Sequence, residues 1–125
     1  MNLTLNTATA DYTFTLYSPD IKFYRIAGIY TFVICPEKKD IQHPASIIQS
    51  YSLLYAGITN DFYARLRTHH KIQQAAALGM THIGILRKSS GRKRKTIERD
   101  LLKTYNPPLN QTWLQEYINT TKSKI

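Results

Sequence analysis

Three short apolar runs constrain the fold of this chain more than any other feature. They cover residues 29–35 (IYTFVIC), 52–59 (SLLYAGIT) and 81–86 (THIGIL), and they are rich in β-branched and aromatic side chains. Runs of this composition and length are typical of buried strands. Residues 12–17 (YTFTLY) alternate polar and apolar side chains, which predicts one more strand. Residues 1–10 are rich in Thr and Asn, and we expect them to be frayed.

Two longer segments predict helices. Asn60 or Asp61 caps a helix from about residue 61 to 78, and Gly79 supplies its C-terminal stop. A second helix runs from about residue 93 to 105 and ends before Pro107. Short helical turns are expected at 45–50 and at 113–117. The chain fits one domain, and its mixed elements predict an α+β fold, in which helices flank a small central antiparallel sheet of about three core strands.

The charge balance indicates an anionic partner. The chain carries 17 Lys and Arg against 8 Asp and Glu, a formal net charge of +9 at pH 7. A domain this basic usually binds nucleic acid, although charge by itself also serves solubility. Six basic residues fall within nine positions of one predicted turn, and we expect them to track phosphates: Arg87, Lys88, Arg92, Lys93, Arg94 and Lys95.

The sequence carries no signal for a membrane or an oxidising compartment. No apolar run approaches the roughly 18 residues needed to cross a bilayer, and residues 1–12 do not resemble a signal peptide. Cys35 is the single cysteine, so it cannot form an intramolecular disulfide. We therefore expect a cytoplasmic protein without a membrane partner.

The helix predicted over residues 61–78 places two polar side chains on its apolar side. That side is formed by Phe62, Leu66, Ile72, Gln73 and Ala76. Arg65 and His69 fall within the same arc, one turn apart. An unpaired buried charge is unfavourable, so Arg65 either reaches the rim, pairs with an acid, or faces a cleft where its planar fork meets phosphate. An ordinary hydrogen bond is the simpler explanation for an inward His69 on its own.

Glu98 is the candidate metal ligand of the second predicted helix. It lies one turn from Arg94, so an ordinary surface ion pair is one interpretation. The other is a hard oxygen ligand for Mg²⁺ or Mn²⁺, since magnesium needs only one or two protein carboxylates besides water and substrate phosphate. A catalytic zinc site is not expected, because His69 and His70 point to different sides of a helix and lack a partner at ligand spacing.

Two tripeptides, GIY ending at Tyr30 and YAG beginning at Tyr55, open a pattern that resembles the GIY-YIG nuclease family. Ala56 stands where the family usually has isoleucine or valine. Residues 31–54 are longer than the tight hairpin usual in the family. The extra length centres on residues 36–50, which either contact substrate or have a structural role.

The remaining residues of the pattern follow in the family's order. Arg65 lies ten positions after Tyr55, and His69 lies four positions further on. Glu98 stands in an Ile-Glu-Arg context, where the family has its metal-binding glutamate. Asn110 ends the sequence PPLN and matches the asparagine that closes the family's domain, where it is expected to brace the site. The match spans roughly residues 26–112, with residues 1–25 as an extension that can add a strand and 113–125 as a short helix or tail.

The resemblance implies a metal-dependent endonuclease. Tyr30 would accept a proton from the attacking water, and His69, which titrates near about 6.5 when unperturbed, is the best candidate to receive it. Arg65 would hold the scissile phosphate, with Tyr55 close to the phosphate or the water. Mg²⁺ or Mn²⁺ on Glu98 would stabilise the leaving oxygen.

The expected substrate is DNA, as a duplex or as branched or nicked DNA. A homodimer is one arrangement that could cut both strands, and the sequence leaves the oligomeric state open. One alternative is a non-catalytic nucleic-acid-binding module that kept the GIY-YIG fold. Another is an unrelated small basic protein in which the pattern is a coincidence.

Overall fold

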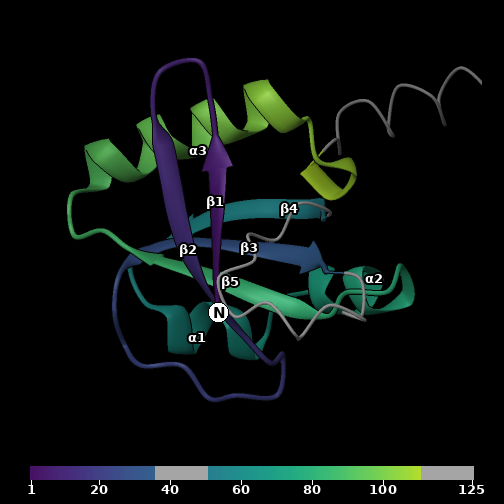
Figure 1. Cartoon of the computed structure of the whole chain (residues 1–125). Coiled ribbons are helices and arrows are strands. Elements are labelled where there is room, and N and C mark those ends of the chain that lie inside the picture. The colour runs from purple at the N-terminus through teal and green to yellow at the C-terminus, as the bar shows by residue number, and fades with distance from the viewer. Residues whose placement is uncertain (36–50, 111–125) are drawn as a thin grey trace, which may run out of the picture.

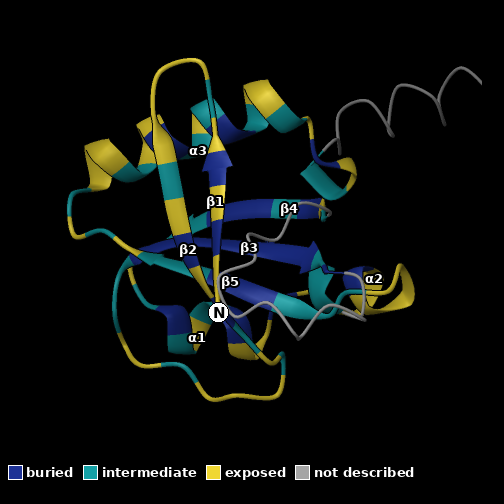
Figure 2. Cartoon of the chain, in the orientation of Figure 1, coloured by how far each residue is buried: buried dark blue, intermediate teal, exposed yellow. Residues whose placement is uncertain are grey.

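Five antiparallel strands form one sheet in the computed structural model, which describes residues 1–35 and 51–110. The strands are β1 (Asn2–Asn6), β2 (Asp11–Tyr17), β3 (Gly28–Ile34), β4 (Ser52–Thr59) and β5 (His82–Arg87). Their order across the sheet is β1-β2-β5-β3-β4, so β3 lies inside the sheet and β4 lies at one edge. Six of the seven residues of β3 are buried, as Figure 2 shows.

Few helices accompany this sheet in the described residues, and two of the α-helices are only six and seven residues long. The helices are α1 (Phe62–Arg67), α2 (Lys71–Ala77), α3 (Gly91–Tyr105) and a short 3-10 helix, η1 (Pro108–Asn110). Figure 1 shows α3 on one side of the strands and α1 and α2 on the other. Successive side chains of a strand point to opposite faces. Ile29 therefore packs with Ile97 and Leu101 of α3, whereas Tyr30 packs with Phe62 and Leu66 of α1.

The sheet curls into a half-barrel because the β1–β2 hairpin turns toward α3 (Figure 1). Asp100 of α3 holds this hairpin by accepting hydrogen bonds from Thr9 Oγ1 at 2.6 Å and from the Tyr12 hydroxyl at 2.7 Å. The Tyr105 hydroxyl donates to the Asn6 carbonyl oxygen at 2.8 Å. One core cluster is thus enclosed between α3 and the curled strands.

The predicted fold class, a sheet of about three core strands flanked by helices, was wrong. The structure has five strands in one curled sheet and few helices. Residues 1–10 were expected to fray because of their Thr and Asn content, yet Leu3 and Leu5 of β1 are 2% and 0% exposed. Their alternation with Asn2, Thr4 and Asn6 is the two-residue period of a half-buried strand, and it outweighs the composition.

The other predicted strands were confirmed within one residue at each end, and α3 begins two residues earlier than predicted. The single helix predicted over residues 61–78 was wrong, because α1 ends at Arg67 and α2 starts at Lys71. The arc predicted for that helix therefore does not continue past Thr68: Ala75 is buried, while Gln73 and Ala76 are exposed. The turns predicted at 45–50 and 113–117, and the long stretch 36–50, lie outside the described residues.

No helix within residues 1–35 and 51–110 is long and apolar enough to cross a membrane.

Candidate active site

Tyr30 is the centre of a partly buried polar cluster on the α1 side of the sheet, in which Tyr55 and Arg65 are half-buried. Its side chain is only 1% exposed, yet its hydroxyl accepts a hydrogen bond from Arg65 Nε at 3.2 Å and lies 2.7 Å from His69 Nε2. Tyr55 also hydrogen-bonds Tyr30, and the two rings stack with centroids 5.9 Å apart. We call Tyr30, Tyr55, Arg65 and His69 the Tyr30 cluster. The structure thus brings together four of the residues that the sequence singled out.

Glycines make room for this cluster. Gly57 lies opposite Tyr30 in the register of β3 and β4. A Cβ at Gly57 would lie 2.5 Å from both Cζ and the hydroxyl oxygen of Tyr30, so a larger residue would push the phenol aside. Gly28 has a similar role, since a Cβ there would meet Phe62 Cζ at 2.5 Å and collide with the Leu86 carbonyl. The glycines of both tripeptides are therefore explained by close packing.

His69 lies in the break between α1 and α2, where its ring contacts Tyr30. The His69 imidazole is 4% exposed and lies between the two helices in sequence. Its Nδ1 accepts a hydrogen bond from the Lys71 amide at 3.0 Å, which satisfies an amide at the start of α2. Because Nδ1 is an acceptor, the neutral ring carries its proton on Nε2 and donates it to the Tyr30 oxygen.

The electrostatics of His69 agree with this assignment. Burial lowers the pKa of His69 to about 4, and the positive charges of Arg65, His70 and Lys71 add to the effect. The ring is therefore neutral at pH 7 and donates to Tyr30. The role expected from the sequence, in which His69 receives a proton from Tyr30, does not fit a ring whose Nε2 already holds one and whose Nδ1 is engaged.

Tyr30 and Arg65 both keep their protons in this environment. Burial raises the pKa of Tyr30 above its ordinary value, Tyr55 raises it further, and Arg65 opposes the shift. Burial disfavours the charged form of Arg65, but interactions with Tyr30 and Tyr55 outweigh it and raise the pKa of the guanidinium. At neutral pH the neutral phenol of Tyr30 therefore accepts a hydrogen bond from the charged guanidinium of Arg65.

The lowered pKa of His69 predicts a loss of stability in acid. The unfolded chain binds a proton at His69 below about pH 6.5, whereas the folded chain resists it until about pH 4. The free energy of unfolding should therefore fall as the pH drops through this interval. Urea unfolding at pH 7 and pH 4.5 should show a smaller fall for His69→Gln than for the native chain. The matched control is His70→Gln at the exposed neighbour, and an equal fall in all three proteins would contradict the assignment.

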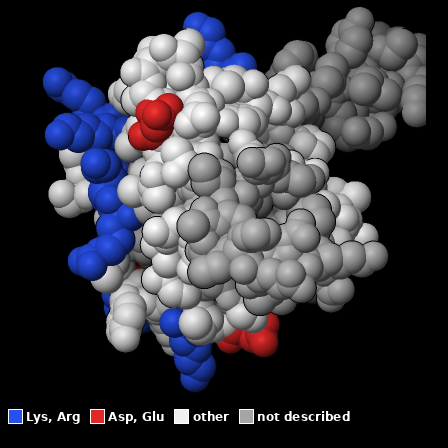
Figure 3. Space-filling view, in the orientation of Figure 1, with Lys and Arg blue, Asp and Glu red and all other residues white. Residues whose placement is uncertain are grey.

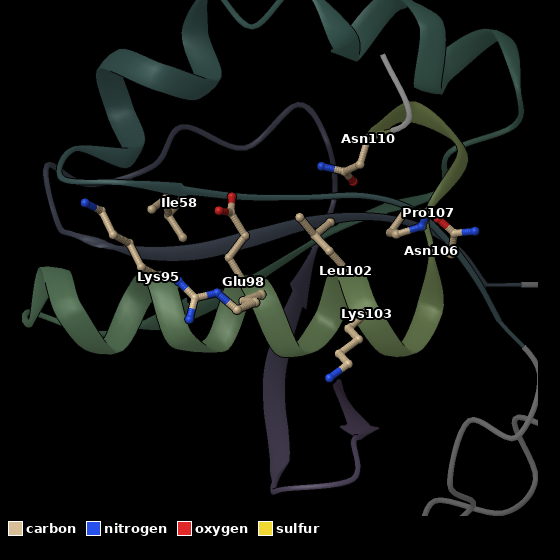
Figure 4. A pocket seen from close by; sticks show the side chains of 9 residues that line it. Ile58, Lys95, Glu98, Leu102, Lys103, Asn106, Pro107 and Asn110 are labelled. Carbon is tan, nitrogen blue, oxygen red and sulfur yellow. The ribbon is translucent and has the colours of Figure 1, made fainter. Parts of the chain in front are cut away.

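Glu98 lies on the other face of the sheet, in a surface cavity of about 620 Å³ beside α3. Figure 4 shows its carboxylate pointing from α3 toward β4, close to Ile58. The side chain is half-buried, and burial raises the pKa of the carboxyl group. Within the described ranges Glu98 has no hydrogen bond or ion pair; Arg94, the partner expected for a surface pair, instead donates from Nη1 to the Lys88 and Ser89 carbonyls at 3.0 and 2.8 Å.

Asn110 connects the two faces at the edge of the sheet. Its Oδ1 accepts from the Ala56 amide and its Nδ2 donates to the Ala56 carbonyl, both at 2.8 Å. The carboxamide thus pairs with the open edge of β4 as another strand would. Asn110 also lines the α3 cavity with Glu98 (Figure 4). Its neighbour Leu109 packs on the opposite face, against the hydrophobic core that contains Tyr30 and Phe62. Strand β4 separates Glu98 and Asn110 from the Tyr30 cluster.

Basic side chains gather along one flank, over the turn between β5 and α3 (Figure 3). Arg87, Arg92, Lys93 and Lys95 are exposed, and Lys95 also lines the α3 cavity. The sequence reasoning missed two further cations of this cavity, Arg99 and Lys103. Lys95, Arg99 and Lys103 follow one another at intervals of four residues. This spacing could have revealed them, because residues one turn apart share a helix face.

The residues present fit a lightly held magnesium or manganese ion. Among the described residues nothing pairs with the Glu98 carboxylate, which faces a cavity with room for water and phosphate. In the described part of the chain no three His, Cys, Asp or Glu side chains group as a metal site, so a metal would depend on substrate oxygens for most of its ligands. No protein-family model, curated protein or solved structure matches this chain.

Proposed function

We propose that this chain is a metal-dependent endonuclease that hydrolyses phosphodiester bonds in DNA. The observation that carries the proposal is the fixed guanidinium of Arg65. Its Nε is bound to the Tyr30 hydroxyl at 3.2 Å and the guanidinium also hydrogen-bonds Tyr55, which leaves others of its five N–H donors for a phosphate. A structural arginine would be expected to pair with an acid, but no carboxylate pairs with Arg65 in residues 1–35 and 51–110. The ordered residues that resemble the GIY-YIG family support the same reading.

Hydrolysis requires a positioned water and stabilisation of the charge that develops on the phosphate. Arg65 would supply that charge. The Tyr30 oxygen accepts hydrogen bonds from Arg65 and His69 before substrate binds. If phosphate drew Arg65 away, the Tyr30 oxygen could accept a hydrogen bond from the attacking water. That hydrogen bond would orient the water, whose proton would pass to a phosphate oxygen or to bulk solvent, because the Tyr30 phenol keeps its own proton.

Glu98 would hold Mg²⁺ or Mn²⁺ together with substrate oxygens, and because β4 stands between Glu98 and the Tyr30 cluster, the DNA would have to cross the sheet edge at β4 to contact both. When bound, the metal would supply charge to stabilise the leaving oxygen. The raised pKa of Glu98 means that acid weakens this site, because the carboxyl group must be ionised to bind a cation. The Asn110 carboxamide, bound to Ala56, would keep the α3 cavity in register with β4.

We expect the exposed basic side chains to contribute affinity without sequence specificity. Replacing Arg87, Arg92 and Lys93 by Ala should reduce the slope of log affinity against log salt by up to about three units, if all three contact phosphates. The cut-site pattern should not change, because phosphate contacts carry no direct sequence information. The matched control exchanges Lys and Arg at the same positions, which keeps the charge and should keep the slope. If the Ala variant kept the salt dependence of the native chain, these three residues would not contact phosphates.

One observation favours a second candidate, a nucleic-acid-binding module without catalysis. Tyr30 is 1% exposed, so its hydroxyl can serve packing alone. The two functions are separated by incubating purified protein with plasmid, single-stranded and branched DNA, in Mg²⁺ and in EDTA. Cleavage of any of these only with Mg²⁺ supports the nuclease. Binding without cleavage in either Mg²⁺ or Mn²⁺ supports the second candidate.

A further inference from the structure

An exposed tyrosine stands between basic side chains in the loop that joins β2 to β3. Tyr24 is 82% exposed, the largest value among the large apolar side chains of the described ranges. Lys22 and Arg25 beside it are also exposed. A ring this open makes little contact with the core, and tyrosine, with an apolar ring and a polar hydroxyl, is enriched at binding interfaces.

This loop is fixed to the start of α1. Arg25 Nη1 contacts Asp61 Oδ2 at 2.6 Å, and the other carboxylate oxygen of Asp61 caps α1 by accepting from the Ala64 amide at 3.2 Å. The Phe62 amide also donates to the Ile26 carbonyl at 3.0 Å. The exposed ring is therefore presented by an anchored loop, which lowers the entropy lost when a ligand binds.

Two guanidinium groups lie near a second tyrosine on α1. The Cζ atoms of Arg25 and Arg67 are 4.5 and 5.2 Å from the centroid of the Tyr63 ring. A surface cavity of about 350 Å³ opens beside them, lined by Tyr63 and Arg67 and by Ile21 and Lys22 of the loop. The Tyr63 ring and two guanidinium groups thus lie beside an apolar hollow with a cationic rim, and Tyr24 directly precedes Arg25 in the loop. We call Lys22, Tyr24, Arg25, Tyr63 and Arg67 the Tyr24 surface.

We propose that the Tyr24 surface binds the unpaired bases of a single-stranded nucleic acid. Bases of any sequence stack on aromatic rings and on arginine planes, while nearby cations hold the backbone. Bases inside a duplex are already stacked on each other and cannot use the ring. Tyr63 and Arg67 lie one turn apart on α1, whereas Arg65 projects from the opposite side of this helix toward Tyr30. The inference rests on the proposed function and deepens it by naming the strand state of the nucleic acid that the chain binds.

Fluorescence anisotropy tests this inference without catalysis. Labelled oligo-dT, oligo-U and a DNA duplex are titrated with the native chain, Tyr24→Ala and Tyr24→Trp in EDTA. Removing one stacking ring should weaken binding of the single strands by about 5- to 150-fold, since stacking contributes about 1–3 kcal/mol per base. Duplex affinity should stay within about twofold, and Tyr24→Trp should bind single strands at least as tightly as the native chain. The matched control is Leu78→Ala, which removes another exposed apolar side chain and should change nothing.

Native-like binding of both single strands by Tyr24→Ala would overturn the inference, as would an equal loss for duplex and single strand. Tyr24→Ala that loses binding of an acidic peptide but not of oligonucleotides would overturn it in favour of a protein partner. Cleavage by the native chain is scored separately with Mg²⁺. If the native chain cleaves DNA but Tyr24→Ala binds single strands as the native chain does, only the inference about the Tyr24 surface is refuted. A chain that binds single strands through Tyr24 but never cleaves refutes only the nuclease.

Discussion

Arg65→Ala is expected to slow single-turnover DNA cleavage by about 10²- to 10³-fold, because it removes a donor aimed at charge that develops in the transition state. Arg65 Nε lies 3.2 Å from the Tyr30 hydroxyl, so the guanidinium is already next to Tyr30 before substrate binds. The measurement is the rate of cleavage with enzyme in excess over a labelled substrate, alongside the affinity for the same DNA in EDTA.

Arg65→Lys is the graded control for this experiment. It keeps the charge but loses the planar fork, so its rate should fall between those of the native chain and Arg65→Ala. Loss of the bond to Tyr30 should lower the free energy of unfolding by only about 1 kcal/mol, which leaves the protein folded. A native cleavage rate combined with weaker binding would place Arg65 among ordinary phosphate contacts.

Glu98→Gln is expected to reduce Mg²⁺-dependent cleavage by more than about 10³-fold, because the metal is asked to supply several kcal/mol of transition-state stabilisation. The amide keeps the shape of the side chain and removes the charge that would hold the cation. DNA affinity in EDTA should not fall, since a negative charge is removed from the α3 cavity.

Asp100→Asn is the matched control for Glu98, two residues further along α3. Asp100 faces the β1–β2 hairpin, where it accepts bonds from Thr9 and Tyr12. Its substitution should lower stability and leave the cleavage rate of the folded protein unchanged. If Glu98→Gln cleaved DNA at the rate of the native chain, Glu98 would not be the metal ligand.

The strands of the sheet were predictable where their side chains carried a local signal. β4 was predicted with its observed ends, and β3 and β5 to within one residue, because apolar and β-branched residues mark a buried strand. β1 was missed because Thr and Asn content was given more weight than the alternation of Leu3 and Leu5. The curl of the sheet was not predictable, since it depends on distant contacts such as Tyr12 with Asp100.

The site could be predicted only in part for the same reason. Periodicity placed Arg65 and His69 on one side of a helix, but it could not reveal the break at Thr68. The break accompanies a bond between His69 and Tyr30, which lie 39 positions apart in sequence. The proton position on His69 likewise depends on the Lys71 amide, whose direction only the folded backbone defines. No sequence pattern indicated that β4 would separate Glu98 from the Tyr30 cluster.

The most direct test of hydrolysis at the Tyr30 cluster is single-turnover cleavage of labelled DNA by the native chain and by Tyr30→Phe, in Mg²⁺ and in EDTA. The native chain should cleave with Mg²⁺ and not with EDTA. Tyr30→Phe removes one hydroxyl and keeps the ring over Gly57, so it should bind DNA normally and cleave at least about 10²-fold more slowly. Equal cleavage by the two proteins, or full cleavage in EDTA, would contradict a metal-dependent nuclease site at Tyr30.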